Sequence, residues 1–230
     1  MKHASDDRHR LGAPDSLRTE MEQLGLILSE EVLAGCLAHW ELLTEAARGR
    51  NLISSGDLEK GPVRHTGDAL ACLVRWPLVG TLRLLDVGSG GGFPGIPLAI
   101  ARPELSVTLL EGRERKADWL ERAVRELGLR ERVSIVTGRL EDQPPGWAAQ
   151  YEVVTARAVA PPDELLTLVL PELKKGGQLL LWHSDRQRQT IQAMIDKENK
   201  MAVYEIQDSV SHLFESIDFI TNITCVRRVR

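Results

Sequence analysis

The sequence has few cysteines, no long apolar run and no excess of positive charge. Its three cysteines, Cys36, Cys72 and Cys225, are widely spaced and form no Cys-x-x-Cys or Cys/His ligand pattern, so they indicate reduced thiols. No apolar stretch approaches the roughly 20 residues that span a bilayer. The first residues include acids and lack the apolar core of a signal peptide. We therefore expect a cytoplasmic protein with no metal and no membrane partner.

The charge balance is mildly acidic. The sequence has 29 Lys and Arg against 33 Asp and Glu, a formal net charge of -4 at pH 7. A protein that coats nucleic acid carries the opposite balance. The acidic balance therefore argues against a coating protein, but not against an enzyme that touches nucleic acid through a local basic rim.

The chain is long enough for one large domain or two small ones. It has 230 residues, 43% of them hydrophobic, with no internal repeat and no low-complexity segment. Residues 1–15 are polar and without apolar periodicity, which predicts disorder. Residues 16–80 are predicted to form a small N-terminal helical extension, in which Ser29 caps a helix that runs to Ala47. Residues 81–230 are predicted to form the main domain.

After Gly80, short β-type runs alternate with amphipathic helices, as is typical of a parallel sheet covered on both faces. The predicted strands are Leu82–Val87, Ser106–Glu111, Val133–Thr137, Tyr151–Ala156 and Gln178–Trp182. The predicted helices are Val63–Val74, Arg113–Leu127, which is capped by Gly128, and Asp163–Leu173. Beyond Asp185, a polar helix and two β-rich runs, Val203–Ile206 and Phe219–Val229, predict a late antiparallel strand at a sheet edge. The pattern indicates the α/β fold class.

The most informative stretch is an apolar strand that runs into a glycine-rich loop and then a helix. It reads Leu84-Leu85-Asp86-Val87-Gly88-Ser89-Gly90-Gly91-Gly92-Phe93-Pro94-Gly95-Ile96-Pro97. Glycine permits positive φ and lets a ligand approach the backbone. A plain tight turn would need only one or two glycines, so the loop favours a ligand site for a dinucleotide or for S-adenosylmethionine.

The spacing favours the second of these ligands. Residues 90–95 satisfy Gly-x-Gly-x-x-Gly, but Pro94 removes a backbone donor where a pyrophosphate needs one. Asp86, two residues before the first glycine, would receive an ammonium group directly or through water, and adenosylmethionine has such a group. Pro94 and Pro97 would then lie in the first turn of the next helix, where a missing N–H costs little.

Two further positions support a nucleoside site. Glu111 closes the next predicted strand, where its carboxylate would accept both ribose hydroxyls, although a strand-end acid also serves as a helix cap. Leu140 and Glu141 follow the third strand, where a side chain and backbone would flank an adenine.

Four stretches resemble the glucose-inhibited division protein B family, the 16S ribosomal RNA guanine-N7 methyltransferases also called small subunit methyltransferase G. The most specific is the run from Asp86 to Ile100, with Gly-Phe-Pro-Gly-x-Pro-Leu-Ala-Ile after the loop. The other three, in order, are Asn51-Leu52-Ile53 with Arg64-His65 and Asp68, then Gly138-Arg139-Leu140-Glu141, then Thr155-Ala156-Arg157-Ala158-Val159-Ala160.

The resemblance implies a Class I methyltransferase fold, Rossmann-like, with a seven-stranded, mostly parallel sheet and a small N-terminal helical extension. It implies methyl transfer from S-adenosylmethionine to a guanine N7 in 16S rRNA of the small ribosomal subunit. Carried over by position, the cofactor contacts would be Gly88, Phe93, Leu140, Glu141 and Arg157. The physical argument adds Asp86, Ser89, Gly90 and Glu111.

The chain also departs from the family pattern. His183-Ser184 stands where the family usually has Lys-Gly after the fifth strand, and residues 187–216 align with nothing in it. Both departures lie where substrate would approach the strand ends.

The chemistry implied needs no general base, because guanine N7 carries a lone pair and no proton. Amino methylases place an Asn/Asp-Pro-Pro-aromatic motif after the fourth strand, and this chain has Thr155-Ala156-Arg157-Ala158 there. Cytosine-C5 enzymes need a nucleophilic cysteine, and no cysteine stands near a predicted strand end. The chemistry that these observations leave is catalysis by positioning the two reacting atoms.

Candidates for substrate positioning are Arg157, His65, Arg64 and Asp68. Arg157 would hold a carboxylate, a phosphate or a base edge, or else form a surface salt bridge. His65 is either a buried structural histidine or a substrate contact. RNA also requires cations against its phosphates, and the candidates are Arg48, Arg50, Arg64, Arg113, Arg115, Lys116, Arg186 and Arg188.

Four hypotheses follow. The first is an S-adenosylmethionine-dependent rRNA guanine-N7 methyltransferase. The others are a small-molecule methyltransferase, a nicotinamide-dependent dehydrogenase and a non-catalytic RNA-binding module that keeps the loop.

Overall fold

The computed structural model describes residues 14–47, 52, 55–145, 147–157, 160–170, 173–198 and 203–230. The helices before the sheet are α2 (Pro14–Gln23), α3 (Glu30–Ala47), α4 (Ser55–Glu59), the π-turn η1 (Val63–Gly67), α5 (Asp68–Leu70) and α6 (Cys72–Arg75). The later helices are α7 (Gly95–Ala101), α8 (Glu114–Glu126), α9 (Pro162–Val169) and α10 (Arg188–Glu198), with short 3-10 turns η2 (Leu140–Asp142), η3 (Ala148–Gln150), η5 (Asp185–Gln187) and η6 (Glu215–Ile217).

Seven strands form one sheet in the order β3-β2-β1-β4-β5-β7-β6. They are β1 (Arg83–Val87), β2 (Ser106–Glu111), β3 (Val133–Thr137), β4 (Val153–Arg157), β5 (Gln178–His183), β6 (Tyr204–Phe214) and β7 (Phe219–Arg228). The first five strands are parallel, and β7 pairs antiparallel with both β5 and β6. The strand order reverses between β1 and β4, the point where ligands bind in open α/β sheets. The seven-stranded, mostly parallel sheet of the α/β prediction is confirmed.

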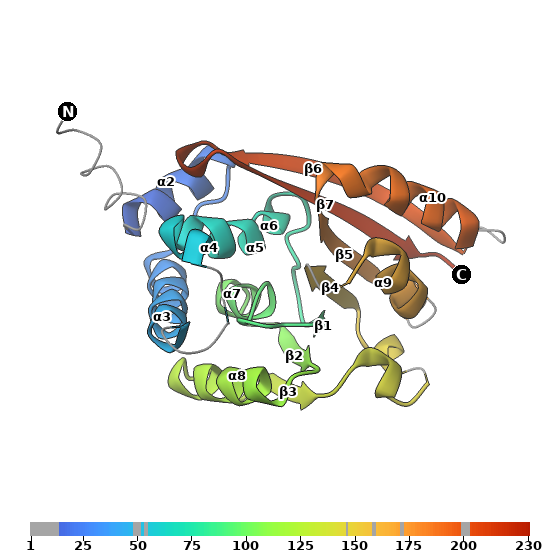
Figure 1. Ribbon diagram of the computed structural model, residues 1–230, viewed down its shortest axis with the longest axis horizontal. Coiled ribbons are helices and arrows are strands. Elements are labelled where there is room, and N and C mark those ends of the chain that lie inside the picture. The colour runs from blue at the N-terminus through green and yellow to red at the C-terminus, as the bar shows by residue number, and fades with distance from the viewer. Residues whose placement is uncertain are drawn as a thin grey trace.

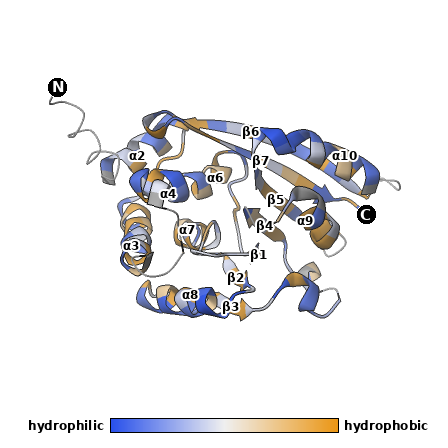
Figure 2. Cartoon of the chain, in the orientation of Figure 1, coloured by the Kyte–Doolittle hydropathy of each residue, from blue (hydrophilic) through white to orange (hydrophobic). Residues whose placement is uncertain are grey.

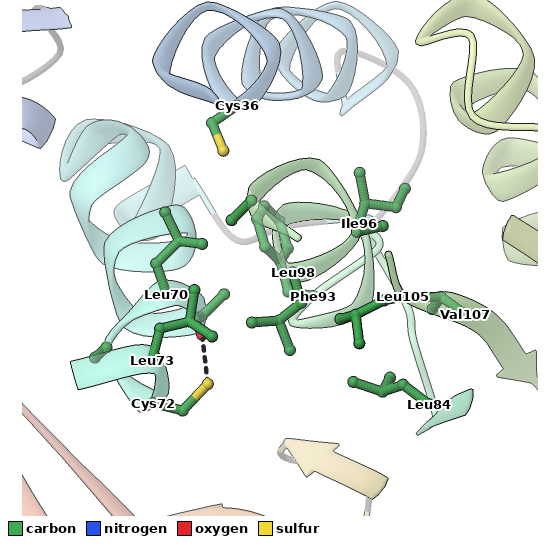
Figure 3. Close-up of a cluster of buried hydrophobic side chains, with 14 of the residues drawn as sticks. Cys36, Leu70, Cys72, Leu73, Leu84, Phe93, Ile96, Leu98, Leu105 and Val107 are labelled. Carbon is green, nitrogen blue, oxygen red and sulfur yellow. Dashed lines mark hydrogen bonds between the residues drawn. The ribbon is translucent and has the colours of Figure 1, made fainter. Parts of the chain in front are cut away.

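Helices cover both faces of the sheet (Figure 1). One hydrophobic cluster joins the helices before β1 to α7, α8 and one face of the sheet, and a second joins α9 and α10 to the other face. Figure 3 shows Cys36, from α3, and Leu70, from α5, facing Leu98 and Phe93. The predicted N-terminal extension thus shares its core with one face of the sheet.

Local sequence signals account for the helix ends. The Ser29 hydroxyl accepts a hydrogen bond from the Val32 N–H at 3.3 Å, the first-turn cap that the sequence predicts for α3. Gly128 follows α8 with φ of 68°, the left-handed conformation of a helix C-terminus. Hydrophilic residues prevail along α8 and α10 (Figure 2), and no described helix is long and apolar enough to cross a membrane.

Several predicted boundaries were wrong. The helix predicted over Val63–Val74 is divided into η1, α5 and α6, because the chain widens into a π-turn where His65, Thr66 and Gly67 are buried. The strand predicted over Val203–Ile206 continues to Phe214 as β6. Its alternation is weak because an edge strand pairs on one side only and a register shift interrupts it between Ile206 and Asp208.

Other boundaries moved less. α2 begins at Pro14, inside the segment 1–15 for which we predicted disorder. α9 spans Pro162–Val169, against the predicted Asp163–Leu173, and β4 and β5 each end one residue later than predicted.

Candidate functional site

The glycine-rich loop, Gly88 to Pro94, joins β1 to α7 at the switch point of the sheet. Its backbone is tied to β2: the Gly88 N–H donates to the Leu110 carbonyl at 2.8 Å, and the Gly90 N–H donates to Glu111 Oε2 at 2.9 Å. Gly88, Gly90 and Gly92 have φ of 69°, 57° and 95°. The loop is therefore a preformed turn held against the end of β2.

Close packing explains the glycine that follows the loop. A Cβ on Gly95 would lie 2.4 Å from Leu109 Cδ2 and 2.8 Å from Asp86 Oδ2. Only glycine lets α7 begin this close to β1 and β2. Pro94 stands at the N-cap, just before α7, and Pro97 lies in the first turn. The prediction was correct for Pro97 and one position off for Pro94.

Asp86, near the end of β1, is hydrogen-bonded to the start of α7 and to β4. Its carboxylate is completely buried and accepts the Thr155 hydroxyl at 2.8 Å and the Gly95 N–H at 3.2 Å. Burial raises the pKa of Asp86 to about 6, against the hydrogen bonds from Thr155, Ser89 and Gly95 that lower it. These contacts give Asp86 a part in holding the loop, with no exposed surface of its own. The contact with an ammonium group, direct or through water, that its position predicts stays a prediction.

Glu111 closes β2 beside the loop and is only 6% exposed. Its two oxygens each accept a backbone N–H, from Gly90 and from Arg113, both at 2.9 Å. An ionised carboxylate has about four acceptor positions, so the capping role and a ligand role do not compete for the same lone pairs. Ser89 is buried, and its hydroxyl donates to the Asp86 carbonyl at 2.9 Å.

A second group of polar residues lies at the end of β4. The Arg157 guanidinium donates from Nη1 to Asp68 Oδ2 at 2.7 Å and from Nη2 to His65 Nδ1 at 2.8 Å. Arg64 lies 3.4 Å from the same Asp68 oxygen. The Asp68 main-chain carbonyl accepts the Trp182 indole N–H at 3.0 Å. The structure thus brings together the four residues that we predicted for substrate positioning.

The ring of Phe93 joins the two groups. Arg157 Cζ lies 5.1 Å from its centroid and the His65 ring stacks on it at 5.2 Å. Burial lowers the pKa of His65 to about 2, with further lowering from Arg157 and Arg64. His65 is therefore neutral, and because arginine only donates, its Nδ1 is the acceptor of the Arg157 bond.

A polar cavity of about 430 Å³ lies next to this group. It is lined by Arg64, His65, Asp68, Arg157, Ala160, Leu165, Leu181, Trp182, His183, Ser184, Gln187, Phe219, Ile220 and Thr221. The volume is in the range of small-molecule sites. The polar cavity therefore adjoins the end of β4, with Phe93 of the glycine-rich loop close by.

Comparison with known proteins identifies the family. The family model for rRNA small subunit methyltransferase G matches residues 35–218. The chain belongs to this family. It is 36% identical over 177 residues to ribosomal RNA small subunit methyltransferase G of Staphylococcus epidermidis, covering 76% of this chain and 74% of that one.

A second relative and a solved structure agree. The chain is 38% identical to the Neisseria meningitidis methyltransferase G over 163 residues, 71% of this chain and 76% of that one. The fold is similar to the O-methyltransferase of Bacillus cereus in complex with SAH, with a TM-score of 0.56, 17% identity and coverage of 83% and 90%. Of the four hypotheses, family membership supports the first.

Three residues of the site were missed by sequence reasoning about this methyltransferase. Each of them donates a hydrogen bond: His39 to the Gly91 carbonyl, Thr155 to the Asp86 carboxylate and Trp182 to the Asp68 carbonyl. His39 lies far from the loop in sequence, and the apolar spacing around it indicates only a buried helix face. Thr155, one strand away from Asp86, was quoted as part of sequence stretches and given no role of its own.

The departures from the family pattern have structural roles. His183, where the family usually has Lys, is buried and its Nε2 lies 2.8 Å from the Thr224 hydroxyl, which links β5 to β7. Ser184 and Gln187 form a capping box on η5. Both residues line the polar cavity, so the departures change one wall of the site while keeping the sheet intact.

The remaining predicted site residues divide into two kinds. Leu140 is buried and Glu141 exposed on η2, after β3. Of the cations predicted to meet RNA, Arg113, Arg115, Arg186 and Arg188 are exposed and Lys116 is half-buried. Arg64 lies 3.9 Å from the centroid of the Phe219 ring. Arg48, Arg50, Asn51, Ile53, Ala158 and Val159 lie outside the described residues.

The three cysteines are free and buried. Burial raises the pKa of Cys36 and of Cys225 to about 12 and also raises that of Cys72, so all three thiols stay protonated at neutral pH. Within the described ranges, no group of three or more His, Cys, Asp and Glu could hold a metal ion.

Proposed function

We propose that the protein transfers the methyl group of S-adenosylmethionine to N7 of a guanine in 16S rRNA of the small ribosomal subunit. The observation that carries the proposal is the juxtaposition, around Phe93, of a preformed glycine-rich loop and a polar cavity with a guanidinium at its edge. Family membership supports the methyl-transfer reaction, and the ribosomal substrate accords with our expectation of a cytoplasmic protein.

The residues at the strand ends suit this methyl donor. A Cβ on Gly90 would have only the Gly88 carbonyl and Lys116 Nζ within 4 Å, at 3.7 and 3.8 Å, so the loop leaves room beside it. Gly88, Gly90 and Phe93 would cradle the amino-acid part, and Asp86 and Ser89 would hold the cradle in shape. Glu111 would accept the ribose hydroxyls, and Leu140 and Glu141 would flank the adenine. When bound, S-adenosylmethionine supplies an electrophilic methyl group on a sulfonium.

The protein's own residues contribute by orientation. Guanine N7 needs no base, so the task is to place its lone pair in line with the methyl group and to exclude water. Arg157, fixed by Asp68 and His65, would donate to an acceptor of the base edge. The apolar wall of the polar cavity, with Leu165, Leu181 and Trp182, would exclude water from the base.

The decisive experiment supplies labelled S-adenosylmethionine to naked 16S rRNA and to 30S subunits from a strain that lacks the gene. We expect label in the RNA at one guanine, and we expect borohydride reduction followed by aniline to cleave the chain there, because N7 methylation makes the base labile. Labelled RNA that resists this cleavage would move the reaction to another atom. Label found only in a small metabolite would favour the small-molecule methyltransferase.

Binding measurements test the dehydrogenase hypothesis. Calorimetry should detect S-adenosylhomocysteine binding and no NADH binding. Tight NADH binding without S-adenosylhomocysteine binding would overturn the proposal.

A further inference from the structure

A histidine of the N-terminal extension contacts the glycine-rich loop from behind. His39, on α3, is completely buried, and its Nε2 lies 2.9 Å from the Gly91 carbonyl oxygen. The His39 ring also lies 4.8 Å from the Phe93 ring, centroid to centroid. A Cβ on Gly92 would come within 3.0 Å of the same Nε2. One side chain therefore touches three successive residues of the loop.

The hydrogen bond fixes the form of this histidine. A carbonyl oxygen only accepts, so His39 Nε2 carries the proton and donates. Burial lowers the pKa of His39 to about 4, against the Gly91 bond that raises it, so the ring stays neutral around neutral pH. His39 Nδ1 is buried and has no hydrogen-bond partner among the described residues. His39 thus differs from an apolar core residue by one contact, the hydrogen bond that its Nε2–H donates to the loop.

The His39 hydrogen bond holds a different part of the loop from the other hydrogen bonds. The Gly88 and Gly90 N–H groups are held by β2 and Glu111, and the Gly92 N–H donates to the Ser89 carbonyl at 2.7 Å. The β2 contacts act at the start of the loop, whereas the His39 bond acts at its middle, on the peptide between Gly91 and Gly92. Without it, the buried Gly91 carbonyl would lose its donor, and the peptide that leads through Gly92 to Phe93 would be held less firmly.

We propose that His39 is a positioning residue for the methyl-donor site, holding the middle of the glycine-rich loop through its Nε2–H. The inference rests on the proposed function, because it takes this loop as the site of S-adenosylmethionine. It also gives α3 a part in cofactor binding in addition to its part in the core.

The test compares His39→Gln with His39→Asn. The side-chain amide of glutamine places an N–H near the position of Nε2, whereas that of asparagine places it near Nδ1. We expect His39→Gln to keep the dissociation constant for S-adenosylhomocysteine within about threefold, and His39→Asn to raise it about tenfold or more. Binding is measured by calorimetry at a temperature where circular dichroism shows each variant to be folded.

A matched control separates positioning from packing. Cys36→Ala lies one turn earlier on α3, is completely buried, and removes packing from the same helix without removing a hydrogen bond to the loop. It should lower the melting temperature and leave the dissociation constant unchanged. If His39→Asn does not fold, His39→Met takes its place, since it fills similar space without a donor.

The possible outcomes distinguish a failure of the role of His39 from a failure of the proposed function. Equal affinity in His39→Asn, His39→Gln and the unchanged protein would overturn the role of His39, as would equal weakening in both variants. An unchanged protein that binds no S-adenosylhomocysteine would instead overturn the proposed function.

Discussion

The glycine-rich loop is made of consecutive residues, whereas the polar cavity gathers residues that lie far apart in the sequence. In the loop, most bonds join backbone groups to each other, and the Gly90 N–H donates to a strand-end acid, Glu111. At the edge of the cavity, Arg157 of β4 reaches back 89 residues to Asp68. The comparison teaches that the loop depends on backbone conformation and the cavity on side-chain geometry. Substitutions in the loop should therefore weaken cofactor binding, whereas substitutions in the cavity should slow methyl transfer.

The largest effect is expected from a side chain on the loop. Gly88→Asp places a Cβ and a charge at a residue with φ of 69°, and we expect it to weaken S-adenosylhomocysteine binding by at least about 100-fold in calorimetry. Gly128→Asp is the matched control, because φ is 68° there and a Cβ would meet nothing within 4 Å. It should cost about 1 kcal/mol of stability and leave affinity unchanged. Equal loss of affinity in both variants would show that backbone strain alone explains the effect.

The same difference explains how much could be predicted from the sequence. The loop, β1 to β5 and the face of α8 follow from local patterns, because glycine spacing and apolar periodicity are written in neighbouring residues. The contact between His65 and Arg157 depends on how η1 packs against the end of β4, and no local pattern specifies that. The Val63–Val74 segment has helical periodicity throughout, so its division at a π-turn is decided by tertiary packing.

The partner of Asp86 could not be predicted for a related reason. Its position two residues before Gly88 indicates a ligand, and the structure shows that Thr155, from the neighbouring strand, already uses the carboxylate. Likewise, the β6 edge strand has too little alternation to be recognised beyond Ile206, since only its pairing with β7 defines it.

The second prediction tests the loop through pH. The pKa of Asp86 is raised from 3.8 to about 6, so between these values the folded protein binds more protons than the unfolded chain. The Asp86 contribution to stability therefore falls as pH rises through this window, and ionised Asp86 opposes folding above it. Relative to Asp86→Asn, the unchanged protein should lose up to about 3 kcal/mol between pH 4 and 7.

Urea unfolding of both proteins across this pH range provides the measurement. Asp86→Asn also loses an acceptor for the Gly95 N–H, which adds an offset that does not vary with pH. Parallel stability profiles of the two proteins would mean that the Asp86 carboxylate is less desolvated than the structure indicates.

The third prediction addresses the cavity. Arg157→Lys keeps a cation near Asp68 but loses the planar fork that also reaches His65 Nδ1. We expect methyl transfer to RNA to fall about 10- to 30-fold in kcat/KM, with a stability loss of about 1 kcal/mol and little change in S-adenosylhomocysteine affinity.

Arg83→Lys is the control for Arg157→Lys. Arg83 forms a comparable fork on Glu152, at 3.3 and 3.2 Å, at the opposite end of β1. Transfer should be unaffected there. If Arg157→Lys changes stability and not transfer, Arg157 serves the fold and not the substrate.

The smallest effect is expected beside the cavity, where an exposed cation contributes a single charge toward RNA. Arg188 donates to Ser211 and Asn222, both at 2.9 Å, and its side chain is 46% exposed. Arg188→Ala should weaken RNA binding a few-fold and lower the slope of log affinity against log salt by about 1, because one phosphate contact is lost. Arg122→Ala, on α8, where the side chain is 37% exposed, removes the same charge and should leave the slope unchanged. The net charge of -4 makes this control informative, because a protein that attracted RNA through its overall charge would respond equally to both substitutions, whereas a local rim responds only to the first.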